Sequence, residues 1–251
     1  MRHPLALLLV LAAAAPAAAY ERAQAASGRP VAWVEREIAW SLAEPGSADV
    51  PYAAAVAAAG RAFAAWAEAG CTDLRFTYAA GGPRATSIDG AADGKNVIHW
   101  REHDWPGAPD EIALTTVVYD EATGRITDVD IDLNGEYLYF TASDDPARTE
   151  YDIESALTHE IGHLLGFADS SDPEAVMGHP LRRGDLVRRL GADDLAALCA
   201  VYPARVPKEP GDERIVYAAG CRAAGGAGAG GLLAAAALTL GVLGRPRRHR
   251  P

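Results

Sequence analysis

The stretch HEIGHLLGFAD, residues 159–169, decides the fold. Apolar residues recur at helical spacing before and through it, which predicts a helix over residues 152–165. Residues four apart on a helix share one face, so His159 and His163 can direct ring nitrogens at the same metal ion. Glu160 lies on the adjoining flank of the helix, where it can accept a proton from a water molecule at the metal.

A third ligand is expected just beyond this helix. Gly166 ends the helix and can adopt a positive φ, which lets the chain swing Asp169 back toward the metal. Asp172 and His179 are the alternative third ligands. Three protein ligands with one open position form a catalytic zinc site, whereas the simpler alternative is a helix with a solvated glutamate and two surface histidines.

The flanking sequence predicts an α+β domain with a twisted mixed sheet. The runs EIALTTVVY and RITDVDIDL are rich in β-branched residues and are joined by a turn-forming stretch, so we expect them to be neighbouring strands. No internal repeat interrupts the pattern. The predicted strands are residues 31–40, 74–78, 96–100, 111–119 and 125–133, and the predicted helices are residues 52–69, 152–165 and 192–201.

Residues 152–177, DIESALTHEIGHLLGFADSSDPEAVM, resemble the active-site helix and Met-turn of the matrixins, which are metzincin zinc peptidases. The similarity extends from about Trp33 to Tyr202, and GADDLAALCAVYP (191–203) resembles the closing helix of that family. The resemblance implies a zincin-like catalytic domain of the metzincin type, in which Met177 forms an apolar floor beneath the metal.

The resemblance also implies roles for the site residues. It implies a catalytic zinc on His159 and His163, with Glu160 as the general base. Residues 111–119 are expected to be the antiparallel edge strand to which an extended polypeptide substrate adds as another strand. Matrixins have a third histidine where this chain has Asp169, and an aspartate ligand at this position is found in snapalysin-type metzincins.

Further histidines carry weaker hypotheses. His179, two residues after Met177, is a candidate for stabilising an oxyanion or for lining the wall of the substrate pocket. His99, His103 and Asp104 are close enough in sequence to be considered for a second zinc ion.

An acidic run of period two occupies one face of the predicted strand 125–133. Calcium prefers oxygen ligands, so these carboxylates could hold a structural Ca²⁺. The alternative is a solvated strand face. The three residues are Asp128, Asp130 and Asp132.

Three cysteines are present, at positions 71, 199 and 221. If Cys221 belongs to a sorting segment, Cys71 and Cys199 remain as a pair in an oxidising compartment. A disulfide between these two is expected, with two buried free thiols as the alternative.

Both ends of the chain have the composition of processing segments. Residues 1–19 are predicted to be a secretory signal peptide, since their apolar core is shorter than the ~20 residues that a membrane span needs. After a linker at residues 204–220, residues 221–251 combine Cys221, a Gly/Ala/Leu run and terminal arginines, and resemble MYXO-CTERM sorting signals. The resemblance implies processing near Cys221 and delivery to the cell surface, and the alternatives are a transmembrane anchor or a disordered tail.

The catalytic domain is assigned to residues 20–203, and its charge limits its partners. Residues 20–220 hold 17 basic and 34 acidic side chains, because six of the 23 basic residues lie in the end segments. Nucleic acid is therefore not an expected partner. We expect a monomeric, secreted or surface-displayed zinc endopeptidase acting on polypeptides, and the alternative is an inactive surface binding module of the same fold.

Overall fold

The computed structural model describes residues 19–82, 86 and 92–205. Its main sheet has five strands in the order β2-β1-β3-β5-β4. Four of these strands run parallel, and β4 pairs antiparallel with β5 at the edge of the sheet. The strands are β1 (Glu37–Leu42), β2 (Arg75–Tyr78), β3 (Asn96–Arg101), β4 (Ala113–Tyr119) and β5 (Ile126–Asn134). The predicted α+β class and its antiparallel edge strand are confirmed.

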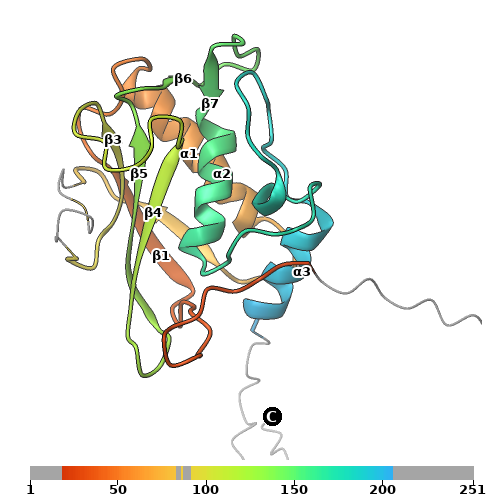
Figure 1. Cartoon of the computed structure of the whole chain (residues 1–251). Coiled ribbons are helices and arrows are strands. Elements are labelled where there is room, and N and C mark those ends of the chain that lie inside the picture. Colours follow the sequence, from red (N-terminus) through yellow and green to blue (C-terminus); the bar gives the residue numbers. More distant parts are fainter. Residues whose placement is uncertain (1–18, 83–85, 87–91, 206–251) are drawn as a thin grey trace, which may run out of the picture. The chain divides into compact units, whose positions relative to one another are not determined.

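Two helices, α1 (Tyr52–Ala67) and α2 (Ile153–Leu164), lie side by side and cover one face of this sheet (Figure 1). Helix α1 is rich in alanine, and its small side chains let the two helices approach closely. A polar contact joins them as well, because Trp66 Nε1 donates to the carbonyl oxygen of Thr158 at 2.9 Å. The side chains that α1 buries are Ala55, Ala58, Ala59, Ala62, Phe63 and Trp66.

The first predicted strand, residues 31–40, is placed too early. Ala32 pairs with Arg125 only through an isolated bridge, and the regular strand β1 begins at Glu37. Trp33 instead packs near the end of α2, where its Nε1 donates to the carbonyl oxygen of Leu164 at 2.9 Å. Alternating apolar residues therefore mark a core contact here, although the strand itself starts later.

A second, smaller sheet was not predicted. Strands β6 (Tyr139–Thr141) and β7 (Glu150–Asp152) pair in parallel just before α2. Three residues are too few for a period of two to be recognised. The small sheet leads the chain directly into the first turn of α2 and so helps to position the helix.

The acidic run on β5 is buried, contrary to a solvated strand face. Asp130 Oδ1 accepts the backbone N–H of Val97 at 2.8 Å, and Asp132 Oδ1 lies 2.8 Å from Arg101 Nε. Asp132 also faces His99 and Thr86. The exposed fractions of Asp128, Asp130 and Asp132 are 2%, 1% and 0%. Apart from Thr127, all residues of β5 are buried, so both faces of this strand are covered over most of its length.

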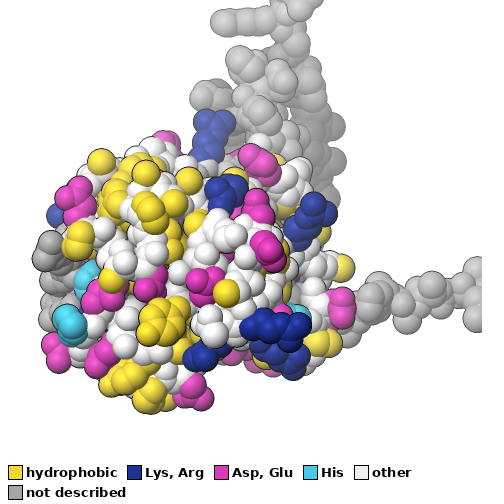
Figure 2. Space-filling view, turned by 90° about the horizontal axis from the view of Figure 1, so that it is seen from above, with side chains coloured by type: hydrophobic (Ala, Val, Ile, Leu, Met, Phe, Trp, Pro, Cys, Tyr) yellow, Lys and Arg dark blue, Asp and Glu magenta, His cyan; other side chains and the backbone are white. Residues whose placement is uncertain are grey.

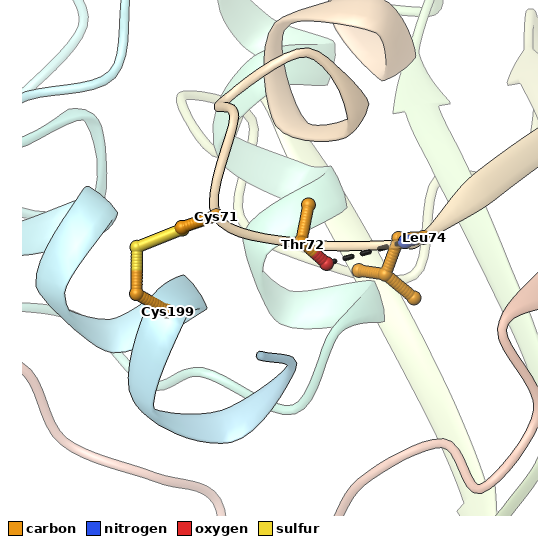
Figure 3. The surroundings of a disulfide bond; sticks show 4 residues. All are labelled: Cys71, Thr72, Leu74 and Cys199. Carbon is orange, nitrogen blue, oxygen red and sulfur yellow. Dashed lines mark hydrogen bonds between the residues drawn. A yellow bond between two sulfur atoms is a disulfide. The ribbon is translucent and has the colours of Figure 1, made fainter. Parts of the chain in front are cut away.

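The closing helix α3 (Ala192–Val201) has the predicted bounds. A disulfide joins Cys199 on this helix to Cys71, in the loop that follows α1 (Figure 3). The two residues are 128 positions apart in sequence. Pro203 extends this contact through a bridge to Thr72.

Within residues 19–82, 86 and 92–205, no helix is long and apolar enough to cross a membrane. Residues 1–18 of the predicted signal peptide, the linker from residue 206 onward and the predicted sorting segment with Cys221 lie outside the described residues.

Candidate metal centre

Helix α2 starts at a strong N-cap that fixes its register. The Asp152 carboxylate accepts hydrogen bonds from the Ser155 backbone N–H at 2.9 Å and from the Ser155 hydroxyl at 2.6 Å. Arg188 Nη2 donates to the other carboxylate oxygen at 2.7 Å. Hydrogen bonds to Asp152, and then to Asp144, raise the pKa of Arg188 above its usual range, so it stays charged beside the cap. These hydrogen bonds fix the N-terminal end of α2, the helix that carries His159 and His163.

Three side chains converge at the C-terminal half of α2. The rings of His159 and His163 lie 4.8 Å apart and nearly perpendicular, and both Nε2 atoms face the carboxylate of Asp169. The distances from Asp169 Oδ1 are 3.5 Å to His159 Nε2 and 3.6 Å to His163 Nε2. In the part of the chain that the structure describes, this is the one group of three or more His, Cys, Asp or Glu side chains with metal-ligand spacing.

Hydrogen bonds at the far nitrogens orient both imidazoles. His159 Nδ1 lies 3.0 Å from the carbonyl oxygen of Val176, and His163 Nδ1 lies 2.9 Å from that of Phe167. Since a carbonyl oxygen can only accept, both Nδ1 atoms carry the hydrogen, and in the neutral rings both Nε2 atoms keep a free lone pair. Backbone acceptors of this kind fix the ring tautomer in metal sites.

The residues fit a zinc ion. Ligand atoms at ~2.0–2.1 Å from zinc in a tetrahedron are ~3.3 Å from one another, close to the observed separations of 3.5 and 3.6 Å. Two imidazole nitrogens and one carboxylate oxygen are also donors that zinc accepts. Asp169 is largely exposed, with 76% of its side-chain surface accessible, so the site opens to solvent on the side of the carboxylate.

The turn that returns Asp169 toward the helix depends on Gly166, whose φ is +83°. The backbone N–H groups of Gly166 and Phe167 bond the carbonyl oxygens of His163 and Gly162, as in a Schellman C-cap. A Cβ on Gly166 would lie 2.4 Å from the carbonyl oxygen of Val31. Both the positive φ and this close approach require glycine.

The N-terminal segment braces the same turn. Ala23 N donates to the carbonyl oxygen of Gly166 at 2.9 Å, and Ala168 N donates to that of Glu21 at 3.0 Å. This short antiparallel pairing ends one residue before Asp169. The chain between the helix and the third candidate ligand is therefore held on both sides.

A buried methionine packs against α2 close to the histidines. Met177 lies in the 3-10 turn η2 (Val176–Gly178), with an exposed fraction of 3%. Its sulfur packs so closely on α2 that a Cβ at Gly162 would be 2.1 Å from it. Asp194 of α3 fixes the turn by accepting the N–H groups of Val176 at 2.7 Å and of Met177 at 3.1 Å. Burial raises the pKa of Asp194, although these N–H groups act in the opposite direction.

An open cavity of about 470 Å³ lies beside the three converging side chains. One wall is the start of the edge strand region, with Ile112 and Ala113, and the opposite wall is the segment 178–181. Glu160 lines the cavity with an exposed fraction of 8%, and its Oε2 accepts a hydrogen bond from the Thr115 hydroxyl of β4 at 2.5 Å. An extended chain could lie between these walls along β4.

The alternative ligands lie elsewhere. His179 lines the cavity wall, where its Nδ1 lies 3.3 Å from the carbonyl oxygen of Pro173 and its Nε2 lies 3.7 Å from Asp185. The Asp172 carboxylate accepts the N–H of Glu174. Neither residue belongs to the group formed by His159, His163 and Asp169. The assignment of Asp169 as the third ligand stays a prediction.

The proposed second zinc does not have its ligands assembled. His99, His103 and Asp104 do not form a ligand group among the described residues, and His99 faces Asp132 instead. On β5, Arg101 already supplies a positive charge to Asp132, which makes this acidic run a poor cation site. A structural calcium stays a prediction.

Sequence reasoning missed Thr115 and Asp194 as contacts of the site. Both act across long sequence separations, Thr115 on Glu160 and Asp194 on the turn at Met177. Asp194 lies in the acidic first turn of α3, and in sequence this pattern indicates only the start of a helix.

The arrangement of a mixed sheet, an edge strand and a histidine-bearing helix ended by a glycine turn defines a metzincin-like domain. A family model described as Matrixin matches residues 32–203, and the chain belongs to this family.

Three plant proteins are similar to this chain. Metalloendoproteinase 5-MMP of Arabidopsis thaliana is 34% identical over 150 residues, which cover 57% of this chain and 38% of that protein. Metalloendoproteinase 1 of Glycine max is 37% identical over 68 residues, or 26% of this chain and 22% of that protein. Metalloendoproteinase 1-MMP of Arabidopsis thaliana is 47% identical over 51 residues, or 20% of this chain and 14% of that protein. The chain thus spans less than half the length of each of these relatives.

Proposed function

We propose that this protein is a zinc-dependent endopeptidase that hydrolyses internal peptide bonds of polypeptides. The observation that carries the proposal is the convergence of His159 Nε2, His163 Nε2 and an Asp169 oxygen next to Glu160. Membership in the matrixin family and the metalloendoproteinase names of its relatives support the same kind of activity.

His159, His163 and Asp169 would hold the metal, and Glu160 would be the general base. When bound, zinc supplies a Lewis acid that polarises the scissile carbonyl group and acidifies a water molecule. Glu160 accepts the proton of the attacking water and then delivers it to the nitrogen of the leaving amine. Glu160 is 8% exposed and lines the same cavity as His159 and Asp169.

The substrate would bind as an additional strand. Among residues 19–82, 86 and 92–205, β4 pairs only with β5, which leaves its other edge without a partner strand from this part of the chain. An extended polypeptide can hydrogen-bond to such an edge, and alternate side chains can enter a neighbouring pocket. The cavity between Ile112, Ala113 and the segment 178–181 is positioned to receive one of them. His179 would then line this pocket.

The third ligand would be an aspartate, as in snapalysin-type metzincins. Asp169 lies at hydrogen-bonding to ion-pairing distances from both Nε2 atoms, and its backbone is held by the turn at Gly166 and by the N-terminal segment. A carboxylate ligand adds a negative charge to the site that a third imidazole would not. We expect the purified protein to bind zinc through the side chains of His159, His163 and Asp169 alone.

Hydrolysis of casein or gelatin by the purified chain tests the proposal. Wild-type activity should disappear on addition of a zinc chelator and return when zinc is added back. Glu160→Gln should lower the rate by about 10²–10⁴-fold, because it removes the general base while preserving the size of the side chain. Zinc content of the Gln variant, measured by atomic absorption, should equal that of the wild type. A wild-type protein with stoichiometric zinc and no hydrolysis would contradict the proposal.

Two other functions predict different results. An inactive binding module of matrixin fold would bind polypeptides without cleaving them, and Glu160→Gln would change nothing. A purely structural zinc protein would unfold on chelation, as circular dichroism would show. The open cavity beside Glu160 favours the enzyme, since a structural zinc site has four protein ligands and no open position.

We further propose that the enzyme is secreted and sorted through its end segments. Removal of residues 1–19 as a signal peptide would leave Tyr20 as the first residue. Residues 221–251 would be recognised by a surface-sorting machinery that cuts near Cys221. Mass spectrometry of the protein isolated from its native cell surface and medium would identify both new termini.

A further inference from the structure

The contact between Thr115 and Glu160 joins the edge strand to the proposed general base. Thr115 Oγ1 donates to Glu160 Oε2 at 2.5 Å, across 45 residues of sequence. The bond lies where β4 and α2 approach each other, and its acceptor Glu160 lines the cavity. In Figure 1, β4 is the strand of the main sheet that is drawn next to α2.

Thr115 interrupts an otherwise apolar row on β4. Side chains two apart on a strand point to the same face, and Ala113, Val117 and Tyr119 pack against the hydrophobic core. Thr115 stands between them at the same phase of the strand. Thr115 is partly buried, and Glu160 is the hydrogen-bond partner that the structure gives its hydroxyl.

The chemistry of this bond suits a role in positioning the carboxylate. Threonine is branched at Cβ, so its side chain has few rotamers and its hydroxyl occupies a defined place on the strand. Binding of one carboxylate oxygen prevents rotation of the glutamate side chain, which is otherwise flexible. The other oxygen, Oε1, remains to exchange protons with the reacting groups.

We propose that Thr115 is a positioning residue that fixes Glu160 to the same strand that aligns the substrate. This inference rests on the proposed endopeptidase function. A substrate strand paired to β4 and a general base hydrogen-bonded to β4 are both positioned by the same strand. The distance from the scissile bond to Glu160 then does not depend on relative motion of the sheet and the helix. Small errors in this distance lower the rate of a proton transfer steeply.

The test compares three variants. Thr115→Val keeps the branched shape and removes the hydroxyl, whereas Thr115→Ser keeps the hydroxyl. Thr77→Val is the matched control, since Thr77 lies on β2, at the edge of the main sheet opposite to β4. For each protein we would measure kcat and KM on a fluorogenic peptide, zinc content, and the midpoint of thermal unfolding.

Thr115→Val should lower kcat by about tenfold, in line with the cost of misplacing a catalytic group, while KM changes less than twofold. Thr115→Ser should restore most of kcat, and Thr77→Val should match the wild type. Zinc content and unfolding midpoints should be the same in all four proteins.

Three results would overturn the inference. One is wild-type kcat in Thr115→Val, another is a Ser variant as slow as the Val variant, and the third is a loss that appears in KM alone. An active wild type with any of these results leaves the endopeptidase proposal intact. A wild-type protein that holds zinc but cleaves no peptide would overturn both proposals.

Discussion

At the scale of single residues, Gly162 of α2 leaves no room for a side chain beside Met177. Replacement of Gly162 by alanine would place a Cβ 2.1 Å from the Met177 sulfur and 3.1 Å from Trp66. Because both neighbours are buried, we expect Gly162→Ala to cost about 1–3 kcal/mol of unfolding free energy from overpacking. Urea denaturation followed by circular dichroism would measure this.

Gly60 offers a matched control, since it is also a helical glycine. A Cβ at this position meets nothing within 4 Å. Gly60→Ala should stabilise α1 by about 0.5–1 kcal/mol, because alanine has the higher helix propensity. Equal effects of the two substitutions would contradict the packing account of Met177.

Asp169 provides the prediction that bears most directly on the metal. Asp169→Ala should weaken zinc binding by at least about tenfold, since one of three ligands is lost. Competition with a fluorescent zinc chelator would measure the affinity. Asp172→Ala, three residues further on, is the control and should keep wild-type affinity. Weaker binding in the Asp172 variant alone would identify that residue as the ligand instead.

At the scale of elements, Tyr202 ties α3 to the end of α2. Its hydroxyl donates to the carbonyl oxygen of Leu165 at 2.7 Å and accepts the N–H of Trp33 at 3.0 Å. The side chain is fully buried, and burial raises its pKa to about 12, so it remains a neutral donor at physiological pH. The hydroxyl thus holds the turn that leads to Asp169.

Tyr202→Phe should lower the unfolding free energy by about 1–3 kcal/mol, because it leaves a buried carbonyl and a buried N–H without their partner. The equilibrium urea transition would report this. Tyr139→Phe is a suitable control, since Tyr139 is 65% exposed and its loss of a hydroxyl should cost nothing measurable. Equal stabilities of the Tyr202 variant and the wild type would show that water replaces both bonds.

The three predicted helices and the predicted strands from residue 74 onward each match an observed element to within two residues at both ends. Helices α2 and α3 and the pair of strands β4 and β5 extend over enough residues for a period to be recognised. The histidines of α2 could be paired from their spacing alone, because they lie on one helix. Local periodicity carries this information within a single element.

Other features depend on packing between distant segments, which periodicity does not encode. Asp128, Asp130 and Asp132 follow the spacing of a solvated strand face, yet β5 is an inner strand and its acidic side chains are buried. In the sequence, nothing distinguishes Thr115 from other strand residues. Only the approach of β4 to α2 gives its hydroxyl a carboxylate partner. Such contacts join residues that no window of sequence contains.

At the scale of the whole domain, the Cys71–Cys199 disulfide links two residues that are far apart in sequence. It closes a loop over 128 positions, which in the chain-entropy account corresponds to about 4–5 kcal/mol of stabilisation. The paired variant Cys71→Ser with Cys199→Ser should therefore unfold at a lower temperature than the wild type in a thermal melt. Reductant should lower the wild-type midpoint to that of the variant. A midpoint that does not respond to reductant would show that the bridge contributes little.

The surface of the domain is chemically mixed. Figure 2 shows acidic side chains spread between hydrophobic and basic ones over the face seen from above. The excess of acidic residues in the sequence is thus not gathered into one patch on this face. Charge on this face alone gives no reason to expect a single oriented encounter with a charged partner.

The N-terminal end of the described chain has a practical consequence for producing the protein. Backbone N–H groups of Ala19 and Tyr20 donate to Asp193 at 2.7 and 3.1 Å, and the next residues pair with the turn before Asp169. A leader cut after Ala19 would leave a charged amine at Tyr20, opposite that carboxylate. An affinity tag fused there would remove this charge from the contact with Asp193. Recombinant protein for the zinc and peptide assays should therefore start at Tyr20, with purification handles placed at the other end, so that the contact with Asp193 is kept.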